Sequence, residues 1–412
     1  NADDFAKALD RWADRRVLML GEARHGTAQF YQARAAITRR MIETHGATIV
    51  AVEADWPDAA FANRYVRGLK APKGEAPFQR FPRWMWRNAI MAELLDWMRD
   101  WNRDRPPEAQ AGFYGLDMYN MNASMRAVLA YLDEVDPDAA RIARKRYGCL
   151  QPWINRPDAY GRAVLSSGYK GCEDAVVSQC RDLMNRAQDE STTESDLLDA
   201  TQNAKLVASA ERYHRIMYRG GPAAWNLRDS HMCATLAHLL NTAGPQAKAV
   251  VWAHNSHIGD ARRSEMNWAR GEHSLGQLAR QEWGDDVALI GFGTHAGTVT
   301  AARDWEARKE VMTIRPSHPD SFERLCHDSG VPRFLLDMAA KPVFAEALAP
   351  PRLQRFIGVI YRPESELPSH YMQTEASRQY DGWVWFDRTT ALTAAGPKGR
   401  HVALPPTWPF GT

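Results

Sequence analysis

The sequence predicts an α/β fold in which a mainly parallel central sheet is flanked by helices. Short, almost continuous apolar runs recur along the chain, as expected for strands that are buried on both faces. Amphipathic stretches of helical period separate the first of these runs, as in β-α-β units. The strand signals stop between about residues 124 and 238, where the sequence is charged, Ala-rich and helical in period. We therefore predict one α/β domain over residues 1–412 with a mainly helical insertion at about 124–238.

Eight apolar runs are the expected strands. The first two, 17–20 and 48–52, are separated by a helical stretch, which is the rhythm of a parallel sheet. The other six runs span residues 112–116, 249–252, 287–292, 334–336, 356–361 and 383–386.

Charge and hydropathy exclude two classes of partner. The chain has 52 Lys and Arg residues against 50 Asp and Glu residues, a formal net charge of only +2, whereas nucleic-acid-binding proteins carry a basic excess. No uncharged apolar run reaches the roughly 18 residues that a membrane-spanning helix needs. We expect a small-molecule ligand and neither nucleic acid nor membrane, while the sequence says nothing of the oligomeric state.

The cysteines indicate a reducing compartment. Five are present, an odd number without any C-x-x-C pair, so neither a disulfide scaffold nor a zinc ribbon is expected. The first six residues lack the basic start and apolar run of a signal peptide. Both observations predict a cytoplasmic protein.

The most informative segment follows the first expected strand. Residues 21–27 read Gly-Glu-Ala-Arg-His-Gly-Thr, and ligands of open parallel sheets bind beyond the carboxyl ends of the strands. Glu22 and His25 are three residues apart, so both side chains can face one pocket. A carboxylate beside an imidazole fixes its tautomer and raises its basicity. The alternative is a helix-capping loop that carries a surface histidine.

The helix expected after this turn carries an arginine on its apolar face. Phe30, Arg34, Ile37 and Met41 follow one another at helical spacing. A buried guanidinium requires a carboxylate partner, and Glu53, at the end of the second expected strand, is the predicted one. In the alternative interpretation Arg34 extends along the helix rim to solvent.

A third strand end carries two histidines. His254 and His257 follow the run 249–252; the pair can chelate a metal, stabilise an oxyanion and protonate a leaving group, or be one core and one capping histidine. Parallel strands bring their carboxyl ends to one edge of the sheet. The polar groups expected to converge there are Glu22 with His25, Glu53 with Asp55, and His254 with His257.

Common catalytic signatures are missing from the sequence. It has no G-x-S-x-G nucleophile elbow, no H-E-x-x-H zinc motif and no G-x-x-x-x-G-K-[ST] phosphate loop. The G-x-G-x-x-A match at 291–296 is not followed by a β-α-β unit with a ribose-binding acid. No nucleotide cofactor is indicated, and hydrolysis by histidine-activated water remains.

At these residues the chain is similar to the erythromycin esterase family. The segments that carry the resemblance are 20–27, 52–57 and 252–259, with further similar stretches at 64–68, 81–87, 113–117, 225–229, 358–363 and 369–371. The resemblance implies an α/β fold shared with haem-binding ChaN-like proteins and elaborated by helices. It also implies opening of a macrolide lactone ring by water, without a metal or other cofactor.

Residue by residue, the resemblance gives His25 the role of general base and Glu22 that of its acidic neighbour. Arg34 and Glu53 match the active-site Arg and Glu of the family, and the later histidine pair matches residues 254 and 257. The chain departs from the antibiotic-resistance enzymes at two places, Ala-Arg at 23–24 and Asp-Trp-Pro at 55–57. These resemble a branch sometimes named for succinoglycan biosynthesis, so the macrolide substrate does not transfer with the pocket chemistry.

The resulting hypothesis is metal-independent hydrolysis of an ester or lactone. His25, polarised by Glu22, activates water; Arg34 and His254 stabilise the oxyanion, and His257 protonates the leaving alkoxide. We expect substrate contacts from loops 81–88, 114–125 and 363–371. The predicted contact residues are Asp55, Tyr114, Arg228 and His370, with Trp56, Trp84 and Trp86 as aromatic walls.

Two alternatives remain at this point. The first is a metal-dependent hydrolase with Glu22, His25, His254 and His257 as ligands. The second is a non-catalytic protein that binds a haem-like small molecule, against which stand the several ionisable groups at three strand ends.

Overall fold

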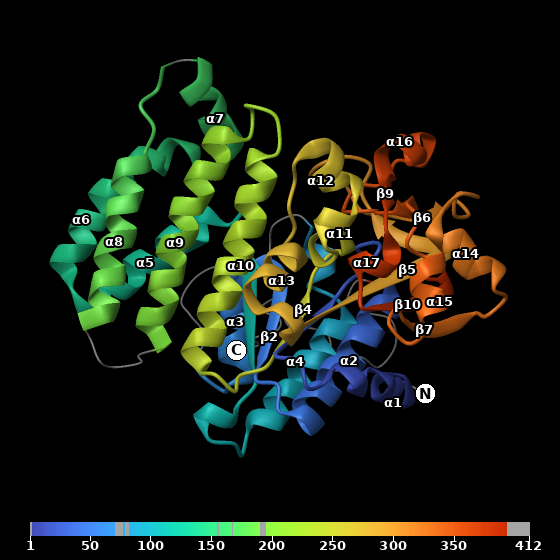
Figure 1. Cartoon of the computed structure of the whole chain (residues 1–412). Coiled ribbons are helices and arrows are strands. Elements are labelled where there is room, and N and C mark those ends of the chain that lie inside the picture. Colours follow the sequence, from blue (N-terminus) through green and yellow to red (C-terminus); the bar gives the residue numbers. More distant parts are fainter. Residues whose placement is uncertain are drawn as a thin grey trace.

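The computed structural model describes residues 2–70, 77–78, 82–154, 156–166, 168–189 and 195–393. Phe81 of the predicted loop 81–88 lies outside these residues. A mostly parallel sheet runs through the middle of the molecule with helices on both faces (Figure 1), so the predicted fold class is confirmed.

The main sheet has eight strands. Its order is β3 (Gly112–Asp117), β2 (Ile49–Asp55), β4 (Ala249–Trp252), β1 (Val17–Leu20), β5 (Val287–Ala301), β10 (Gly382–Thr389) and β7 (Arg333–Asp337), and β6 (Glu310–Ile314) pairs with β5. All neighbours are parallel except β7 against β10 and β6 against β5. A separate antiparallel pair consists of β8 (Arg352–Arg355) and β9 (Tyr371–Thr374).

Alternate side chains of each central strand enter two different cores, as a period of two requires. In β1, Val17 and Met19 pack on one side, whereas Leu18 and Leu20 pack on the other. The first face is covered by α10 (Ala223–Ala243), α13 (Leu275–Trp283) and α14 (Phe322–Asp328). The second is covered by α1 (Ala2–Lys7), α2 (Ala28–His45), α3 (Trp56–Val66) and α4 (Ala89–Asn102).

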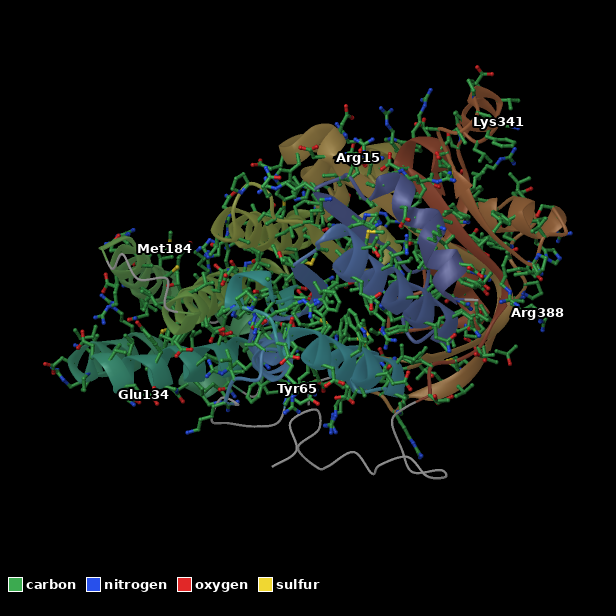
Figure 2. The ribbon with its side chains drawn as sticks, turned by 90° about the horizontal axis from the view of Figure 1, so that it is seen from below. Arg15, Tyr65, Glu134, Met184, Lys341 and Arg388 are labelled. Carbon is green, nitrogen blue, oxygen red and sulfur yellow. A yellow bond between two sulfur atoms is a disulfide. The ribbon has the colours of Figure 1, made fainter. Side chains whose placement is uncertain are left out.

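A helical block lies between β3 and β4 in the sequence. It contains α5 (Met121–Val135), α6 (Pro137–Tyr147), α7 (Pro157–Ser166), α8 (Glu173–Asp189), α9 (Ser195–Ile216) and α10. Glu134 and Met184 mark it at one end of the molecule in Figure 2, whereas Lys341 and Arg388 lie at the other end. The block therefore extends the protein sideways from the sheet, and its last helix, α10, packs against the first face of the sheet.

One expectation about the cysteines is corrected. Cys149 and Cys172 form a disulfide between the turn after α6 and the start of α8, while Cys180, Cys233 and Cys326 are free. Disulfides are more typical of oxidising environments, and the predicted reducing compartment stays a prediction. Within the part of the chain that the structure describes, no helix is both long and apolar enough to cross a membrane.

The run 356–361 is not a strand, contrary to the prediction. It makes only isolated bridges, through Ile357 to Arg24 and through Ile360 to Ala302. The Ile357 amide donates to the Ala23 carbonyl (2.9 Å), and the His25 amide donates to the Ile357 carbonyl (3.3 Å). The run is apolar because it crosses the buried carboxyl edge of the sheet, where it holds the turn after β1.

Candidate active site

The turn after β1 holds a buried acid–histidine pair. His25 Nδ1 lies 2.8 Å from Glu22 Oε1, and both residues are at most 5% exposed. The sequence permits this turn because Gly26 has φ 74° and a Cβ at Gly21 would overlap the Asn255 side chain. Because Glu22 occupies Nδ1, Nε2 is the ring nitrogen of His25 left for chemistry.

Arg34 of α2 is the third member of this buried cluster. Its Nη2 donates to Glu22 Oε2 (2.9 Å), and its guanidinium lies 4.6 Å from the Tyr31 ring and 4.7 Å from the Trp252 ring. The predicted partner Glu53 is wrong: among the described residues Glu22 is the one carboxylate in ion-pair contact with Arg34. Arg34 therefore orients Glu22 and stays out of the cavity.

Glu53, at the end of β2, belongs to a second charged cluster. Its Oε1 accepts from Arg228 Nη2 of α10 (2.8 Å), and its Oε2 accepts from the His254 amide (2.7 Å). Arg228 also makes a bidentate pair with Asp117 at the end of β3, with distances of 3.0 and 2.6 Å. Glu53 thus links the end of β2 to the ends of two other strands. It is linked to β3 through Arg228 of α10, and to β4 through the His254 amide.

The two histidines after β4 occupy different environments. The His254 ring lies 4.9 Å from the His25 ring, and its Nδ1 accepts from the Ser256 amide (3.3 Å), which places the proton of neutral His254 on Nε2. The His257 Nδ1 lies 2.9 and 3.0 Å from the two oxygens of Asp229, and its Nε2 lies 3.3 Å from Glu53 Oε1. Trp225 stacks flat on His257, with centroids 4.6 Å apart.

These environments separate the proton affinities of the two histidines. Burial and the neighbouring His25 hold the pKa of His254 well below its usual range. Burial acts in the same direction on His257, but the carboxylates of Asp229 and Glu53 outweigh it and raise the pKa to about 9. The pKa of Glu53 is held well below its usual range because His257 and Arg228 outweigh its burial. The two environments therefore shift the proton affinities of His254 and His257 in opposite directions.

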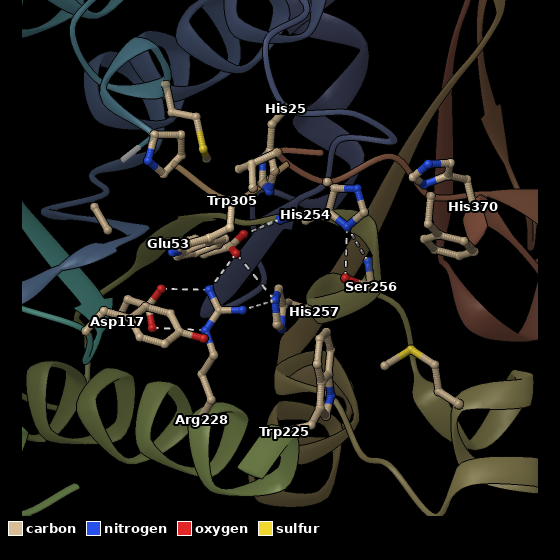
Figure 3. Close-up of a pocket in the computed structure, with 18 of the residues that line it drawn as sticks. His25, Glu53, Asp117, Trp225, Arg228, His254, Ser256, His257, Trp305 and His370 are labelled. Atoms are coloured by element: carbon tan, nitrogen blue, oxygen red, sulfur yellow. Dashed lines mark hydrogen bonds and ion pairs between the residues drawn. The ribbon is translucent and has the colours of Figure 1, made fainter. Parts of the chain in front are cut away.

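His25, Glu53, Asp117, Arg228, His254 and His257 border a cavity of about 430 Å³ (Figure 3), whereas Glu22, Arg34 and Asp229 lie behind its lining. Figure 3 shows His25, Glu53, His254 and His257 converging, with Trp225 beneath His257. Eight predicted site residues line the cavity: His25, Glu53, Asp55, Trp86, Arg228, His254, His257 and His370. Apolar side chains such as Met85, Phe356 and Met372 complete the lining.

Three predicted contact residues lie elsewhere. Trp56 donates its Nε1 to Asp199 of the helical block (2.7 Å) and stacks on Tyr114, so neither ring reaches the cavity. Trp84 is packed in the core on the second face of the sheet. The prediction of aromatic walls is wrong for these residues because it could not tell cavity-facing from core-facing rings.

Four residues of the site were not predicted individually, although Asp117 lies in the predicted contact loop 114–125 and two others lie in the similar stretch 225–229. Asp117 ends a predicted strand, so the strand-end rule that selected Glu53 could have found it. Asp229 and Trp225 lie on α10, a helix whose approach to the sheet no local pattern reveals. Trp305, in the loop between β5 and β6, lines the cavity although it is 57% exposed.

The histidines and carboxylates of the site are not grouped as metal ligands. Both oxygens of Glu22, one of the four ligands of the metal-dependent alternative, are engaged by His25 and Arg34. Among the described residues no group of three or more His, Cys, Asp or Glu side chains is arranged to hold a metal ion. The donor set therefore does not fit the predicted four-ligand metal site.

The fold and the site define a class: a mostly parallel α/β protein with an acid–histidine pair and a charged cluster at the carboxyl edge of its sheet. The erythromycin esterase family model matches residues 42–389, so the chain belongs to the erythromycin esterase family. The match begins after His25 and Arg34 and includes Glu53, Arg228 and both later histidines.

Relatives agree with this assignment. The chain is 20% identical over 395 residues to "Putative hydrolase YbfO" of Bacillus subtilis strain 168, covering 91% of this chain and 84% of the relative. It is 22% identical over 258 residues to erythromycin esterase type I of Escherichia coli, covering 59% and 62%. The family and these relatives support a hydrolase.

Solved structures share the fold. A succinoglycan biosynthesis protein superposes with a TM-score of 0.77 at 19% identity, covering 94% of this chain and 92% of that one. A mutant erythromycin esterase in its open conformation superposes with a TM-score of 0.68 at 17% identity, covering 96% of both chains.

Proposed function

We propose that the protein hydrolyses a carboxylic ester or lactone with water activated by His25. The observation that supports this most strongly is the Glu22–His25 pair. Glu22 is buried behind the cavity lining, and the His25 side chain borders the cavity. A carboxylate on Nδ1 leaves Nε2 unprotonated and ready to accept a proton. Membership in the erythromycin esterase family supports the same chemistry.

In the proposed reaction each side chain of the site has one role. His25 Nε2 removes a proton from water, and the water oxygen attacks the carbonyl carbon. The tetrahedral oxyanion that forms is stabilised by His254 and by Arg228, which takes the place first predicted for Arg34 because Arg228 borders the cavity. The C–O bond to the alcohol then breaks, and the leaving alkoxide receives a proton from His257. The products are a carboxylic acid and an alcohol.

We propose no metal for this reaction, since among the described residues no three or more His, Cys, Asp or Glu side chains are grouped to hold one. Prolonged dialysis against a chelator should leave hydrolysis unchanged. Loss of activity with a chelator, restored by zinc or manganese, would favour the metal-dependent alternative instead.

We also propose a cytoplasmic location for the protein. The Cys149–Cys172 disulfide is the observation that argues against this location. Thiol labelling of the protein in freshly opened cells tests it. Five labelled cysteines would support the cytoplasm, and three would support an oxidising compartment.

The substrate is best sought by a hydrolysis screen over macrolides and other esters and lactones. Macrolides belong in the panel because a relative carries that name, and acylated sugars belong there because a structural neighbour is named for succinoglycan biosynthesis. The His25→Ala variant is the control in every assay. Failure to hydrolyse any member of a broad panel would argue for a binding protein.

A further inference from the structure

Asp229 is a buried carboxylate with an unusual set of partners. It is 0% exposed, and its Oδ1 accepts from the Leu275 amide at the start of α13 (2.7 Å). Among the described residues its one ion-pair partner is His257. A buried carboxylate without a strong partner costs several kcal/mol, so the fold holds this charge against the ring of His257.

His257 is fixed in orientation on three sides. Asp229 lies at Nδ1, the Trp225 ring covers one face at 4.6 Å with an interplanar angle of 6°, and Nε2 points at the Glu53–Arg228 pair. The ring therefore cannot rotate without losing its bond to Asp229. Its catalytic nitrogen is held at the cavity wall by a residue outside the cavity.

The Nε2 atom of His257 has a partner for each of its protonation states. Glu53 Oε1, 3.3 Å away, accepts a hydrogen bond when Nε2 is protonated. Arg228 Nη1, 2.8 Å away, donates one when Nε2 is bare. This arrangement suits a group that loses and regains a proton during turnover.

We infer that Asp229 is a positioning residue that turns His257 into the acid of the reaction, so that the site has two carboxylate–histidine pairs with opposite tasks. Glu22 serves His25, which takes a proton from water, and Asp229 serves His257, which gives one to the leaving alkoxide. Solvent then removes the proton from His25 and restores the one on His257, so the protons balance. This inference rests on the proposed hydrolysis and adds the partner of its acid.

The charges around His257 support this assignment. Asp229 and Arg228 face it from α10, Glu53 from β2, and His254 from the turn after β4, while Asp117 acts on it through Arg228. Three carboxylates against one guanidinium leave a net negative cluster, which a proton on His257 partly neutralises. Removing the charge of Asp229 should lower the affinity of His257 for its proton.

The test is the Asp229→Asn variant, which keeps the size of the side chain and an oxygen for the Leu275 amide. Nitrogen-15 NMR of histidine-labelled protein reads the protonation of His257, assigned with a His257→Gln variant. We expect the titration midpoint of His257 to fall by about 1 to 3 pH units. We also expect kcat to fall about 10- to 100-fold with KM nearly unchanged, and the alkaline limb of the rate profile to move to lower pH.

A matched control is Asp387→Asn, which removes the carboxylate beside another histidine, His327 (2.6 Å), away from the cavity. It should leave the titration of His257 and kcat unchanged. An unchanged His257 titration in Asp229→Asn would show that Asp229 only ties α10 to α13, and would overturn the inference.

The wild-type protein gives a second test that needs no folded variant at Asp229. A strongly deshielded Nδ1 proton on His257 should persist at pH 8, and its absence there overturns the inference. The NMR result is independent of activity. If no ester is hydrolysed but His257 behaves as expected, the proposed function fails while the positioning role stands.

Discussion

Replacing Glu22 with Gln tests the buried cluster behind His25 in both stability and catalysis. The substitution keeps the shape of the side chain but removes the charge that Arg34 Nη2 and His25 Nδ1 share, at 2.9 and 2.8 Å. Arg34 is 1% exposed and would remain as a buried cation without a carboxylate. Breaking a buried pair in this way costs about 3–5 kcal/mol.

The lower end of that range is the better estimate for this site. The rings of Tyr31 and Trp252, at 4.6 and 4.7 Å, continue to attract the guanidinium, by about 1 kcal/mol each. We therefore expect Glu22→Gln to lower the free energy of unfolding by about 3 kcal/mol. We expect kcat to fall about 10²–10⁴-fold because His25 loses its tautomer.

A double-mutant cycle separates the two effects. Arg34→Met removes the stranded cation with a side chain of similar volume, so Glu22→Gln/Arg34→Met should return to within about 1 kcal/mol of the wild type. Activity should stay low, because His25 still lacks its carboxylate. Urea titration and initial rates measure the two quantities. Additive losses of stability, or recovery of activity in the double variant, would refute the account of this cluster.

Three further predictions concern pH, the disulfide and the cavity mouth. The folded pKa of His257, about 9, lies above its ordinary value of 6.5, so its stabilisation should be complete below pH 6.5 and lost as the pH rises through 9; urea titrations at several pH values measure this loss. Cys149→Ser/Cys172→Ser removes a disulfide between residues 23 positions apart and should lower the free energy of unfolding by about 3 kcal/mol. We expect kcat to stay unchanged, and a loss of kcat in the folded variant would contradict the independence of the active site from the helical block. Trp305→Ala should raise KM about tenfold, or about 1.4 kcal/mol, whereas Trp268→Ala, an exposed ring outside the cavity lining, should leave it unchanged in initial-rate assays.

Local patterns predicted the strands that build the edge of the sheet. β1 and β4 have the predicted limits, and β2 and β3 differ from them by a few residues. The parallel arrangement then brings Glu22, Glu53 and His254 to one edge without further assumption. This part was predictable because strand periodicity and the strand-end rule are both local in sequence.

Pairings between distant segments were not predictable in this way. Glu22, rather than Glu53, pairs with Arg34 because the turn after β1 folds back over α2, which no periodicity shows. Asp229 and Arg228 are adjacent in the sequence, yet they contact opposite ring nitrogens of His257, Nδ1 and Nε2. The strand prediction for residues 356–361 was wrong because an apolar run indicates burial and not secondary structure. This run crosses the buried edge of the sheet as a loop.

Hydrolysis in water labelled with oxygen-18 tests the central claim most directly, with wild-type protein and His25→Ala compared on the best ester of the substrate panel. Attack by His25-activated water predicts one labelled oxygen in the carboxylic acid, none in the alcohol, and a rate in His25→Ala lower by at least about 10²-fold. A His25→Ala variant that works at the wild-type rate, or label that appears in the alcohol, would contradict it.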